Sequence, residues 1–367
     1  MLSIVHVYKD YWPVVGGIEN HIKDLAEAEA ALGHDVTVLV TNPGGQRGRE
    51  WLNGVQVIRA ARLATVASTP LSLALPVLLA NLQPDVTHVH FPYPLGEVSQ
   101  WLLSRKRPYL IGYHSDVVKQ QRILRFYNPL LRRVLAGAGQ ILVGSDNYVQ
   151  SSIYLRPFAH KCSIVPYAVD AERFAQAAPG WPEDGRFTIL FMGRHRYYKG
   201  VNDLIQAVAL LPAALAVRLL LGGDGPLRGA WEALSVELGL QDKISFIGNL
   251  SDDDLPRFYA SGDLFVLPAN SRAESFGKVL QEAMAAGLPC MTTELGTGTS
   301  FVVQDGVTGR VVPPRNPAAL AAAIQQLVMN PDLCQKLGQQ GQQRVRTEFS
   351  REQMVTKVEM AYTAVSA

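Results

Sequence analysis

Cysteine is scarce in this sequence of 367 residues. There are three cysteines, Cys162, Cys290 and Cys334, which are far apart and odd in number. A disulfide framework or a cysteine-based metal cluster needs paired or closely spaced cysteines. Both are therefore excluded, and we expect a reducing, cytoplasmic compartment.

Charge of either sign is also modest. Charged residues make up 18% of the chain and the net charge is +2, which is too small to indicate nucleic-acid binding. The N-terminus has neither a basic stretch nor a long apolar run, so we interpret it as a strand and not as a signal peptide. Residues 63–84 carry no charge, but Pro70 and Pro76 interrupt them. This favours a loop and a buried or interfacial helix over a membrane-spanning one.

What the sequence does contain is a long alternation of short β-branched runs and helical patterns. A chain of 367 residues exceeds one ordinary core, so we expect two domains. Helices are predicted at 17–32 and 127–136, and βαβ repeats of this kind predict a parallel sheet with helices on both faces. The predicted strands of the first domain are 2–8, 35–40, 55–60, 85–90, 109–114, 140–145 and 162–167.

The pattern restarts after an Ala-, Pro- and Gly-rich stretch at 170–185, which we interpret as a linker. Residues 317–367 are helical in pattern throughout, and their end is expected to cross back to the first domain. The predicted strands of the second domain are 187–192, 217–221, 243–247, 264–267 and 290–293, and its helices are 201–211, 227–238, 252–259 and 277–286.

Two carboxylates, Glu274 and Glu282, flank a Ser-Phe-Gly turn in the second domain. If a helix begins near Phe276, Glu274 lies in the loop at its N-terminus and Glu282 lies about two turns inside. Backbone N–H groups at such a helix start bind anions. The pattern is typical of a site for hydroxyls beside phosphate, as in a nucleotide-sugar.

A basic loop, Gly193-Arg194-His-Arg-Tyr-Tyr-Lys199-Gly200, follows the first strand of the second domain. The arginine fork matches phosphate oxygens and the lysine offers a movable point charge. Cations placed here would stabilise a diphosphate leaving group. The alternative interpretation is a solvated basic loop, which we favour for Arg196.

Four residues of the first domain are further candidates. Gly16 and Gly17 lie between the first strand and the first helix, where they would let a ligand approach the backbone; the alternative is a tight turn. The motif is not GxGxxG, so a nicotinamide site is not supported. His114 ends a strand and could contact the transferred sugar or the acceptor, and Asp116 could orient an acceptor hydroxyl.

Metal sites are disfavoured. His88 and His90 share one face of a strand, but no carboxylate or cysteine follows at ligand spacing. Asp252 and Asp254 form an Asp-x-Asp, yet Ser251 before them is typical of a helix cap with acids in the first turn.

A basic segment in the first domain indicates attraction to an anionic membrane surface, or else a solvated helix face. It contains one acid, Asp116, and apolar side chains are interleaved. The basic residues are Arg105, Lys106, Arg107, Lys119, Arg122, Arg125, Arg132 and Arg133.

Taken together, these motifs resemble glycosyltransferase family 4, whose members are retaining enzymes of the GT-B fold. The resemblance covers essentially the whole chain. It is carried by the Gly16–Gly17 loop, the Arg194–Lys199 loop, Gly223-Asp-Gly-Pro226, Glu274-x7-Glu282 and Asp305-Gly-Val-Thr-Gly309, in order and spacing. The segments at 113–120 and 294–300 resemble mannosyl- or rhamnosyltransferases of bacterial surface polysaccharides.

The resemblance implies an α/β GT-B architecture, with two Rossmann-like domains facing across a cleft. Residues 1–170 with about 352–367 would bind the acceptor, and residues 171–351 would bind the nucleotide-sugar. Ligands of such sheets sit outside the carboxyl ends of the strands.

The resemblance also implies roles for single residues. Arg194 and Lys199 would bind the diphosphate, and Glu282 would hold the ribose. Glu274 would hold hydroxyls of the donor sugar, near which the family places a histidine, here His114. The remaining donor contacts would come from Gly16, Gly17, Ser275, Phe276, Gly277 and Lys278. One departure is the histidine–arginine pair inside the Arg194–Lys199 loop.

The function so implied is retaining transfer of a mannose- or rhamnose-like hexose from a nucleotide-diphosphate sugar, with GDP-mannose favoured, to a lipid-linked or glycan acceptor. The family uses front-face attack with the donor phosphate as base, and needs no metal or other cofactor. We expect a cytoplasmic protein, peripheral at the inner face of the membrane if the basic segment binds lipid. Open alternatives are a nucleotide-sugar epimerase, a non-catalytic two-lobed sugar-binding protein, and a metal-dependent transferase using Asp252 and Asp254.

Overall fold

The structure, a computed structural model, describes residues 1–14, 16–103, 107–118 and 121–366, without the side chains of 121–123. The chain forms two compact units. Unit 1 comprises Met1–Ala168 and Arg351–Ala367, and unit 2 comprises Val169–Ser350. The boundaries expected from the sequence lie within two residues of this division.

Unit 1 is built on an eight-stranded sheet in the order β10-β9-β8-β7-β1-β2-β4-β3. All neighbours are parallel except β3 and β4. The strand order changes direction between β1 and β7. The strands are β1 (Ser3–Val7), β2 (Asp35–Asn42), β3 (Gly48–Leu52), β4 (Val55–Ala61), β7 (Val86–Phe91), β8 (Tyr109–Tyr113), β9 (Gln140–Val143) and β10 (Cys162–Ile164), with a separate hairpin of β5 (Ala64–Val66) and β6 (Thr69–Leu71).

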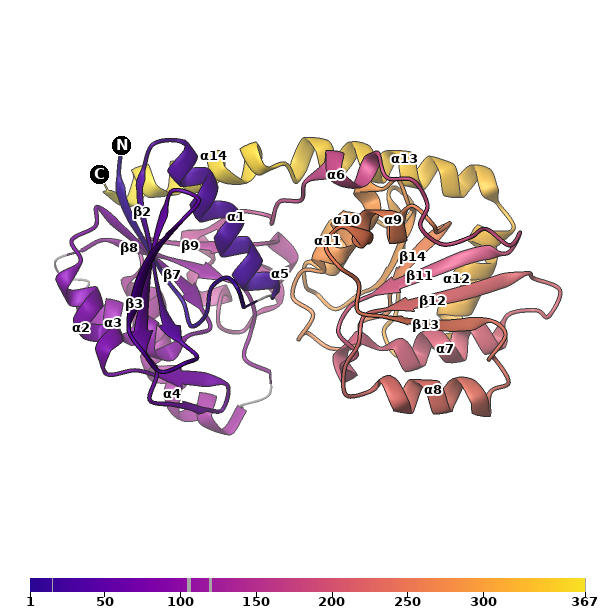
Figure 1. Cartoon of the computed structure of the whole chain (residues 1–367), viewed down its shortest axis with the longest axis horizontal. Helices are drawn as coiled ribbons and strands as arrows, with labels where there is room; N and C mark the ends of the chain where they lie inside the picture. The colour runs from indigo at the N-terminus through magenta and orange to yellow at the C-terminus, as the bar shows by residue number, and fades with distance from the viewer. Residues whose placement is uncertain (15, 104–106, 119–120, 367) are drawn as a thin grey trace. The chain divides into compact units, whose positions relative to one another are not determined.

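Helices cover both faces of this sheet (Figure 1). They are α1 (Gly17–Ala31), α2 (Ala74–Asn81), α3 (Pro94–Leu103), α4 (Gln121–Gly137), α5 (Asp146–Ser151), η1 (Arg156–Lys161) and α14 (Arg351–Ser366). The C-terminal helix α14 packs beside α1, so the expected return of the chain end to the first domain is confirmed.

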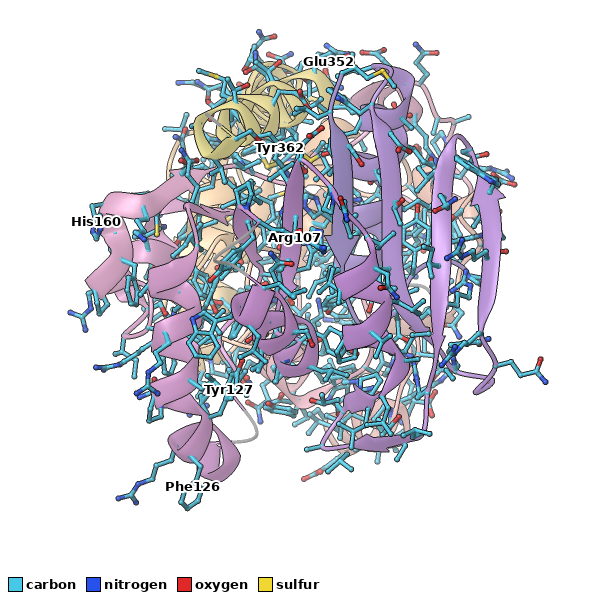
Figure 2. All side chains as sticks on the ribbon, turned by 90° about the vertical axis from the view of Figure 1, so that its left-hand side faces the viewer. Arg107, Phe126, Tyr127, His160, Glu352 and Tyr362 are labelled. Carbon is cyan, nitrogen blue, oxygen red and sulfur yellow. The ribbon has the colours of Figure 1, made fainter. Side chains whose placement is uncertain are left out.

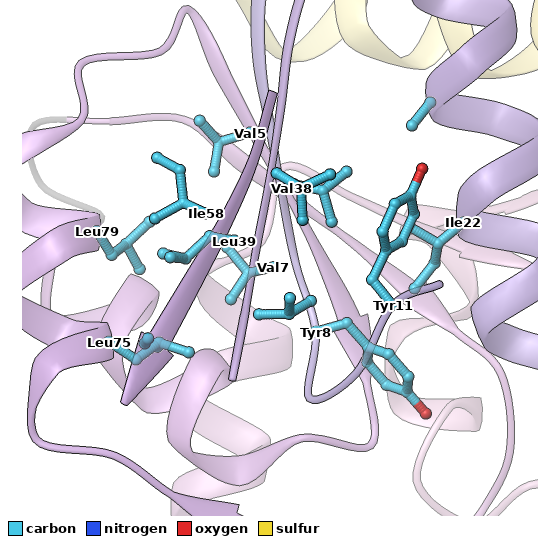
Figure 3. Close-up of a cluster of buried hydrophobic side chains, with 14 of the residues drawn as sticks. Val5, Val7, Tyr8, Tyr11, Ile22, Val38, Leu39, Ile58, Leu75 and Leu79 are labelled. Atoms are coloured by element: carbon cyan, nitrogen blue, oxygen red, sulfur yellow. The ribbon is translucent and has the colours of Figure 1, made fainter. Parts of the chain in front are cut away.

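The core of unit 1 follows the alternation of its strands. On β7, Val89 and Phe91 point to the side of α4, and Val86 points to the side of α14. Aliphatic side chains of β1, β2 and β4 pack against Ile22 of α1 and against Leu75 of α2 (Figure 3). These buried runs are the signal from which the strands were predicted.

Unit 2 contains a six-stranded parallel sheet in the order β13-β12-β11-β14-β15-β16. Here the strand order changes direction between β11 and β14. The strands are β11 (Phe187–Met192), β12 (Val217–Gly222), β13 (Ile244–Gly248), β14 (Leu264–Leu267), β15 (Cys290–Thr293) and β16 (Gly309–Val312).

Helices lie on both faces of the second sheet as well, with α7 and α8 on one side and α9 and α10 on the other (Figure 1). They are α6 (Ala171–Ala175), η2 (Tyr197–Lys199), α7 (Val201–Leu210), α8 (Arg228–Glu237), α9 (Asp254–Tyr259), α10 (Lys278–Ala285), α11 (Thr299–Val302), α12 (Pro317–Val328) and α13 (Pro331–Glu348). The predicted alternation of strands and helices is therefore confirmed in both units.

Two predictions about segments between the strands need correction. The stretch at 170–185 is not irregular throughout, because Asp170 caps α6 by accepting from the Arg173 N–H. In the uncharged segment at 63–84, the expected helix is present as α2, with Leu75 and Leu79 buried, but the expected loop contains the β5–β6 hairpin. Within the described residues, no helix combines the length and apolar character needed to cross a membrane.

Candidate functional site

The change of strand order in unit 2 places two loops side by side. In parallel α/β sheets, ligands bind outside the carboxyl ends of the strands at such a switch point. The loop with Arg194 and Lys199 follows β11, and the loop with Glu274 follows β14, the neighbouring strand. Topology therefore brings together two motifs that lie about 75 residues apart in the chain.

Lys199 is buried at the end of the 3-10 turn η2 and pairs with Glu274. Its Nζ lies 2.7 Å from Glu274 Oε2, and both side chains are about nine-tenths buried. Burial lowers the pKa of the lysine, but the neighbouring carboxylate more than offsets this and leaves the pKa above its usual value. The lysine is therefore charged at neutral pH.

Gly200 sets the direction in which the chain leaves this turn. Its φ is +67°, and a Cβ there would lie 2.0 Å from the carbonyl oxygen of Pro268, the residue after β14. Only glycine allows this backbone conformation together with this close approach. The two loops are thereby held against each other, with the Tyr198 carbonyl accepting from the Asn270 N–H at 3.0 Å.

The Ser-Phe-Gly turn after Glu274 leads into α10. Gly277 adopts the left-handed conformation (φ +83°) at the N-cap, and the helix begins at Lys278. The carbonyl of Ser275 accepts from the Gly298 N–H at 2.8 Å, and Phe276 is buried. The helix thus starts one residue after the start of the predicted range 277–286 and two residues after Phe276, and Glu282 lies about one turn inside it instead of two.

Glu282 is half-buried and is held by a side chain that the sequence did not reveal. The hydroxyl of Tyr259, the last residue of α9, donates to Glu282 Oε2 at 2.8 Å. Burial raises the pKa of Tyr259 well above its usual value, and Glu282 raises it further. Glu282 also raises the pKa of Lys199, so both acids of the motif act on the same lysine.

Arg194 differs from its neighbours because it is exposed, and no acid within the described residues pairs with it. His195 beside it is fully buried, with its ring 4.7 Å from Trp231 and its backbone N–H bonded to the Asp224 carbonyl. The histidine therefore anchors the loop to the Gly-Asp-Gly-Pro turn, which gives the departure from the family pattern a structural role.

In unit 1 the switch point lies between β1 and β7, and the Gly16–Gly17 loop follows β1. Gly16 is extended (φ −169°) at the N-cap of α1, which any residue can adopt. A Cβ on Gly17 would meet nothing within 4 Å. The backbone conformation therefore does not require these glycines. Gly17 leaves open space at the start of the helix, whereas a Cβ on Gly16 would lie 2.2 Å from Glu19 Oε2.

His114 and Asp116 follow β8, and both make internal hydrogen bonds. His114 is buried, with Nε2 2.9 Å from His90 Nδ1 and Nδ1 2.6 Å from the Tyr167 hydroxyl. Asp116 Oδ1 accepts from the hydroxyls of Tyr113 and Ser152, both at 2.8 Å. Both candidates are thus positioned by the core of unit 1.

The structure arranges the two disfavoured metal sites, the Asp-x-Asp and the histidine pair, in different ways. Among the described residues, Asp252 and Asp254 do not belong to any group of three potential ligands that converge. The ring nitrogens of His6, His88 and His90 do converge, within 4.8 Å of one another. These rings are hydrogen-bonded to other side chains, and their chemistry is treated below.

Sequence reasoning also missed a buried acid in unit 1. Glu97 of α3 is fully buried, and it accepts from the Tyr93 N–H and from the Tyr127 hydroxyl. Burial raises its pKa to about 7, although both hydrogen bonds lower it. A lone acid in an otherwise apolar helical pattern was the signal that could have found it.

Comparison with known families matches both units. Residues 15–173 match the family described as Glycosyltransferase Family 4, and residues 173–344 match the family described as Glycosyl transferases group 1. The two matches meet near the division between unit 1 and unit 2.

Curated relatives match over nearly the full length. The chain is 31% identical over 373 residues to O-antigen chain mannosyltransferase C of Escherichia coli, covering 99% of each protein. It is 32% identical over 357 residues to D-rhamnosyltransferase WbpZ of Pseudomonas aeruginosa, covering 95% of this chain and 92% of that protein.

Solved structures share the fold. Sucrose-phosphate synthase from Thermosynechococcus elongatus has a TM-score of 0.82 at 24% identity, covering 99% of this chain and 98% of that one. Anabaena HepE, solved in complex with UDP, has a TM-score of 0.78 at 18% identity, covering 99% and 100%. The expected α/β fold with two Rossmann-like domains is therefore confirmed.

Proposed function

The chain belongs to glycosyltransferase family 4, and we propose that it moves a mannose- or rhamnose-like hexose from a nucleotide-diphosphate sugar to a lipid-linked or glycan acceptor. That it is a glycosyltransferase follows from the family. GDP-mannose is the favoured donor, because a mannosyltransferase and a rhamnosyltransferase are among the relatives that match over nearly their full length, each at more than 30% identity. Retention of the anomeric configuration, without a metal ion, is part of the proposal.

The observation that carries the proposal is the buried Lys199–Glu274 pair at the switch point of unit 2. A pair of this kind is neutral overall and binds no dianion by charge alone. Arg194, exposed beside it, supplies the net positive charge that a diphosphate requires. The lysine ammonium has three donors, of which Glu274 occupies one, so two remain for phosphate oxygens.

The two acids would bind hydroxyls. Tyr259 holds Oε2 of Glu282, and we assign Oε1 to the ribose. Glu274 would accept from the donor sugar while it keeps Lys199 in place. Ser275, Phe276, Gly277 and Lys278 would line the sugar and phosphate with the backbone N–H groups that open α10. As the sugar–phosphate bond breaks, Arg194 and Lys199 would stabilise the growing negative charge on the leaving diphosphate.

Unit 1 would supply the acceptor side. Gly16 and Gly17 would leave room for the donor, His114 would contact the sugar, and Asp116 would orient the acceptor hydroxyl. In the front-face mechanism implied by the family, the proton of that hydroxyl passes to the donor phosphate. No protein nucleophile is then needed.

The test is thermal unfolding with UDP, GDP, ADP and dTDP, with and without EDTA, for the wild type and for Glu282→Ala. A nucleotide at a hundred times its Kd adds about 2.7 kcal/mol to the free energy of unfolding. We expect one nucleotide, GDP, to stabilise the wild type equally with and without EDTA, and to stabilise the variant much less. Stabilisation that EDTA removes would favour the metal-dependent alternative with Asp252 and Asp254.

A transfer assay separates the remaining alternatives. With the stabilising sugar nucleotide and a glycan acceptor, NMR of the product should show the anomeric configuration of the donor. A product that forms without acceptor would indicate a nucleotide-sugar epimerase instead. Binding of sugar without any turnover would indicate a sugar-binding protein.

We further propose peripheral contact with an anionic membrane at its cytoplasmic face. Fewer side chains support this proposal than the basic segment of the sequence suggested. Arg125, Arg132 and Arg133 are exposed on α4, together with Phe126, which is 86% exposed and points away from the unit (Figure 2). Of the remaining basic residues of the segment, the structure describes only the side chain of Arg107. Arg107 donates to the Leu79 and Ala80 carbonyls at the end of α2, and Arg105, Lys106, Lys119 and the side chain of Arg122 lie outside the described residues.

The apolar side of α4 does not face solvent and so does not face a membrane, because Leu124, Leu131 and Val134 pack in the core of unit 1. Among the described side chains, the membrane proposal therefore rests on Phe126 and the three exposed arginines. Flotation with vesicles containing anionic lipid tests it: Phe126→Ser should lower the bound fraction, and vesicles of neutral lipid should bind neither protein.

A further inference from the structure

One face of the unit 1 sheet is lined with histidines where aliphatic side chains would be expected. His6 of β1 stands beside His88 of β7 in the parallel register, and His90 follows on the same face. His114 follows the end of β8, and all four rings are at most 5% exposed. Such a polar layer inside a parallel sheet has to be hydrogen-bonded to be tolerated.

The rings are tightly packed. A Cβ on Gly112 of β8 would lie 2.9 Å from His88 Nε2 and 3.0 Å from His90 Nδ1. The glycine thus makes room for two rings at the centre of the sheet. The stacked rings of His88 and His90 have centroids 4.2 Å apart.

Hydrogen bonds join these rings end to end. Glu29 of α1 places Oε2 2.6 Å from His6 Nε2. His6 Nδ1 is 3.0 Å from His90 Nε2, and His90 Nδ1 is 2.9 Å from His114 Nε2. His114 Nδ1 is 2.6 Å from the hydroxyl oxygen of Tyr167. We call this series, from Glu29 to Tyr167, the histidine chain.

The other oxygen of Glu29 is held from the C-terminal helix. Tyr362, a buried residue of α14 that is labelled in Figure 2, donates its hydroxyl to Glu29 Oε1 at 2.7 Å. The same hydroxyl oxygen is 2.9 Å from His88 Nδ1. Glu29 is therefore fixed by two contacts, and both of its oxygens act as acceptors when it is ionised.

Proton counting restricts how the chain can be arranged. A neutral imidazole carries one N–H, so it donates on one side and accepts on the other. Burial lowers the pKa of His90 and of His114 well below the usual value, so both rings are neutral at pH 7. Their N–H groups must then point the same way, either both toward Glu29 or both away from it.

Charge decides between the two directions. Glu29 and His6 are both fully buried, and a buried carboxylate without a compensating cation is costly. The ring in contact with Glu29 is His6, and a pair that is neutral overall is either a carboxylate with an imidazolium or a carboxylic acid that donates to His6 Nε2. The Nδ1–H of His6 then donates to His90, and every N–H along the chain points away from Glu29.

We propose that Glu29 is a positioning residue for sugar transfer, which through His6 and His90 fixes the proton of His114 on Nδ1. The inference rests on the proposed function, in which His114 contacts the donor sugar. It gives His114 a definite chemistry: its Nδ1–H donates to the oxygen of Tyr167, and a sugar hydroxyl in that place would accept the same hydrogen bond. His114 then orients the sugar and does not act as a base.

A transition-metal ion is the competing occupant, because ring nitrogens of His6, His88 and His90 lie within 4.8 Å of one another. An ion bound to His6 Nδ1 and His90 Nε2 would replace the hydrogen bond between them. The two arrangements therefore exclude each other, and metal content distinguishes them.

The first test uses the unmodified full chain without substrate. Two-bond ¹H–¹⁵N correlation spectra of histidine-labelled protein distinguish Nδ1–H from Nε2–H rings, with signals assigned from single histidine variants. We expect His90 and His114 both to be protonated on Nδ1. Protonation of either ring on Nε2, or about one equivalent of zinc retained after dialysis, would overturn the proposal. This test stands even if no donor sugar is transferred.

The second test asks whether Glu29 acts through His114. Glu29→Met should lower kcat about tenfold with little change in KM for the donor, and Glu29→Gln should keep most of the activity. The amide of Gln can donate to His6 Nε2 while its oxygen accepts from Tyr362, which preserves the direction of the chain. Glu27→Met, on the same helix but outside the chain, is the matched control and should leave kcat unchanged.

The double variant completes this test. In a His114→Asn background, Glu29→Met should cause no further loss of kcat, because residues that act in series are not additive. An equal tenfold loss in both backgrounds, or a Gln variant as impaired as the Met variant, would show that Glu29 only supports the fold.

Discussion

The two units share a layout but fill it with different chemistry. In each, candidate residues follow strands at or beside the point where the strand order changes direction. Unit 2 uses fixed charges there, with Lys199 paired to Glu274 and Arg194 exposed. Unit 1 buries groups that share protons, namely the histidine chain. It also buries Glu97, which pairs with no cation among the described residues and whose pKa burial raises to about 7.

Under the proposed function, this difference corresponds to a division of work between the two units. Fixed cations suit a site that must hold a diphosphate at any pH near neutrality, because lysine and arginine stay charged there. Neutral rings with assigned N–H groups suit a site that orients hydroxyls, because direction matters more than charge for a hydrogen bond of this kind. Removing a charged side chain in unit 2 should therefore lower the rate of transfer more than altering the protonation of a histidine in unit 1.

The largest effect is expected for Lys199→Met. Losing the cation should lower kcat at least about a thousandfold, since one such group commonly contributes ~10²–10³ and the buried Glu274 is left unpaired as well. The unpaired acid should also destabilise unit 2 by about 3–5 kcal/mol, measured by urea unfolding.

A paired variant separates the two losses. Lys199→Met with Glu274→Gln removes both charges, so unit 2 should regain most of its stability while transfer stays absent. Activity that returns together with stability would show that Lys199 has no part in the reaction.

Much of the fold could be predicted because buried parallel strands are continuous apolar runs. Leu264–Leu267 and Cys290–Thr293 were predicted to the residue. The strand Gly309–Val312 was missed because it is short and at the sheet edge, and only its pairing with β15 defines it. The short helix α6 was missed because its Ala-rich sequence resembles the linker around it.

The candidate site was predictable where chemistry is concentrated in one short motif. Lys199, Glu274 and Glu282 stand in such motifs, and the structure places them in one electrostatic environment. Glu29 and Tyr259 stand in ordinary helical patterns, and their roles come from partners that only strand register and helix packing bring near. His88 and His90 were noticed as a pair but not as part of a chain.

The next largest effect is expected in unit 1, where the stability should depend on pH through Glu97. Glu97 has a folded-state pKa of about 7 against a usual 4.5, so protonation favours the folded state. Its contribution is complete below about pH 4.5 and is lost as pH rises toward 7, a change of about 3 kcal/mol in the free energy of unfolding. As the pH rises through this interval, the free energy of unfolding of Glu97→Gln should therefore increase by about 3 kcal/mol relative to that of the wild type.

Urea unfolding of both proteins at pH 5 and pH 8 measures the difference. The comparison with Glu97→Gln is needed because the buried histidines act in the opposite direction: burial lowers the pKa of His88, so its contribution is lost as pH falls below its usual value. A constant difference between the two proteins would mean that Glu97 is ionised in the folded state.

A smaller effect is expected for Arg194→Ala, which should change the rate of transfer but hardly the stability. The side chain is exposed and is not paired with an acid within the described residues, so its loss should change stability by less than about 0.5 kcal/mol. Turnover should fall about a hundredfold, because the diphosphate loses the charge that the Lys199–Glu274 pair does not supply. Steady-state kinetics beside unfolding measures both; a loss of stability without a loss of rate would contradict the assignment.

The smallest change in stability is expected at the start of α1. Gly17 is the first residue of that helix, and a Cβ there meets nothing within 4 Å. Gly17→Ala should therefore keep or raise the stability of unit 1 by a few tenths of a kcal/mol, because alanine is the better helix former. If the space is kept for the donor, KM for the sugar nucleotide should rise several-fold in the same variant. Unchanged KM would remove the Gly16–Gly17 loop from the site and leave unit 1 with His114 and Asp116 as its candidate contacts.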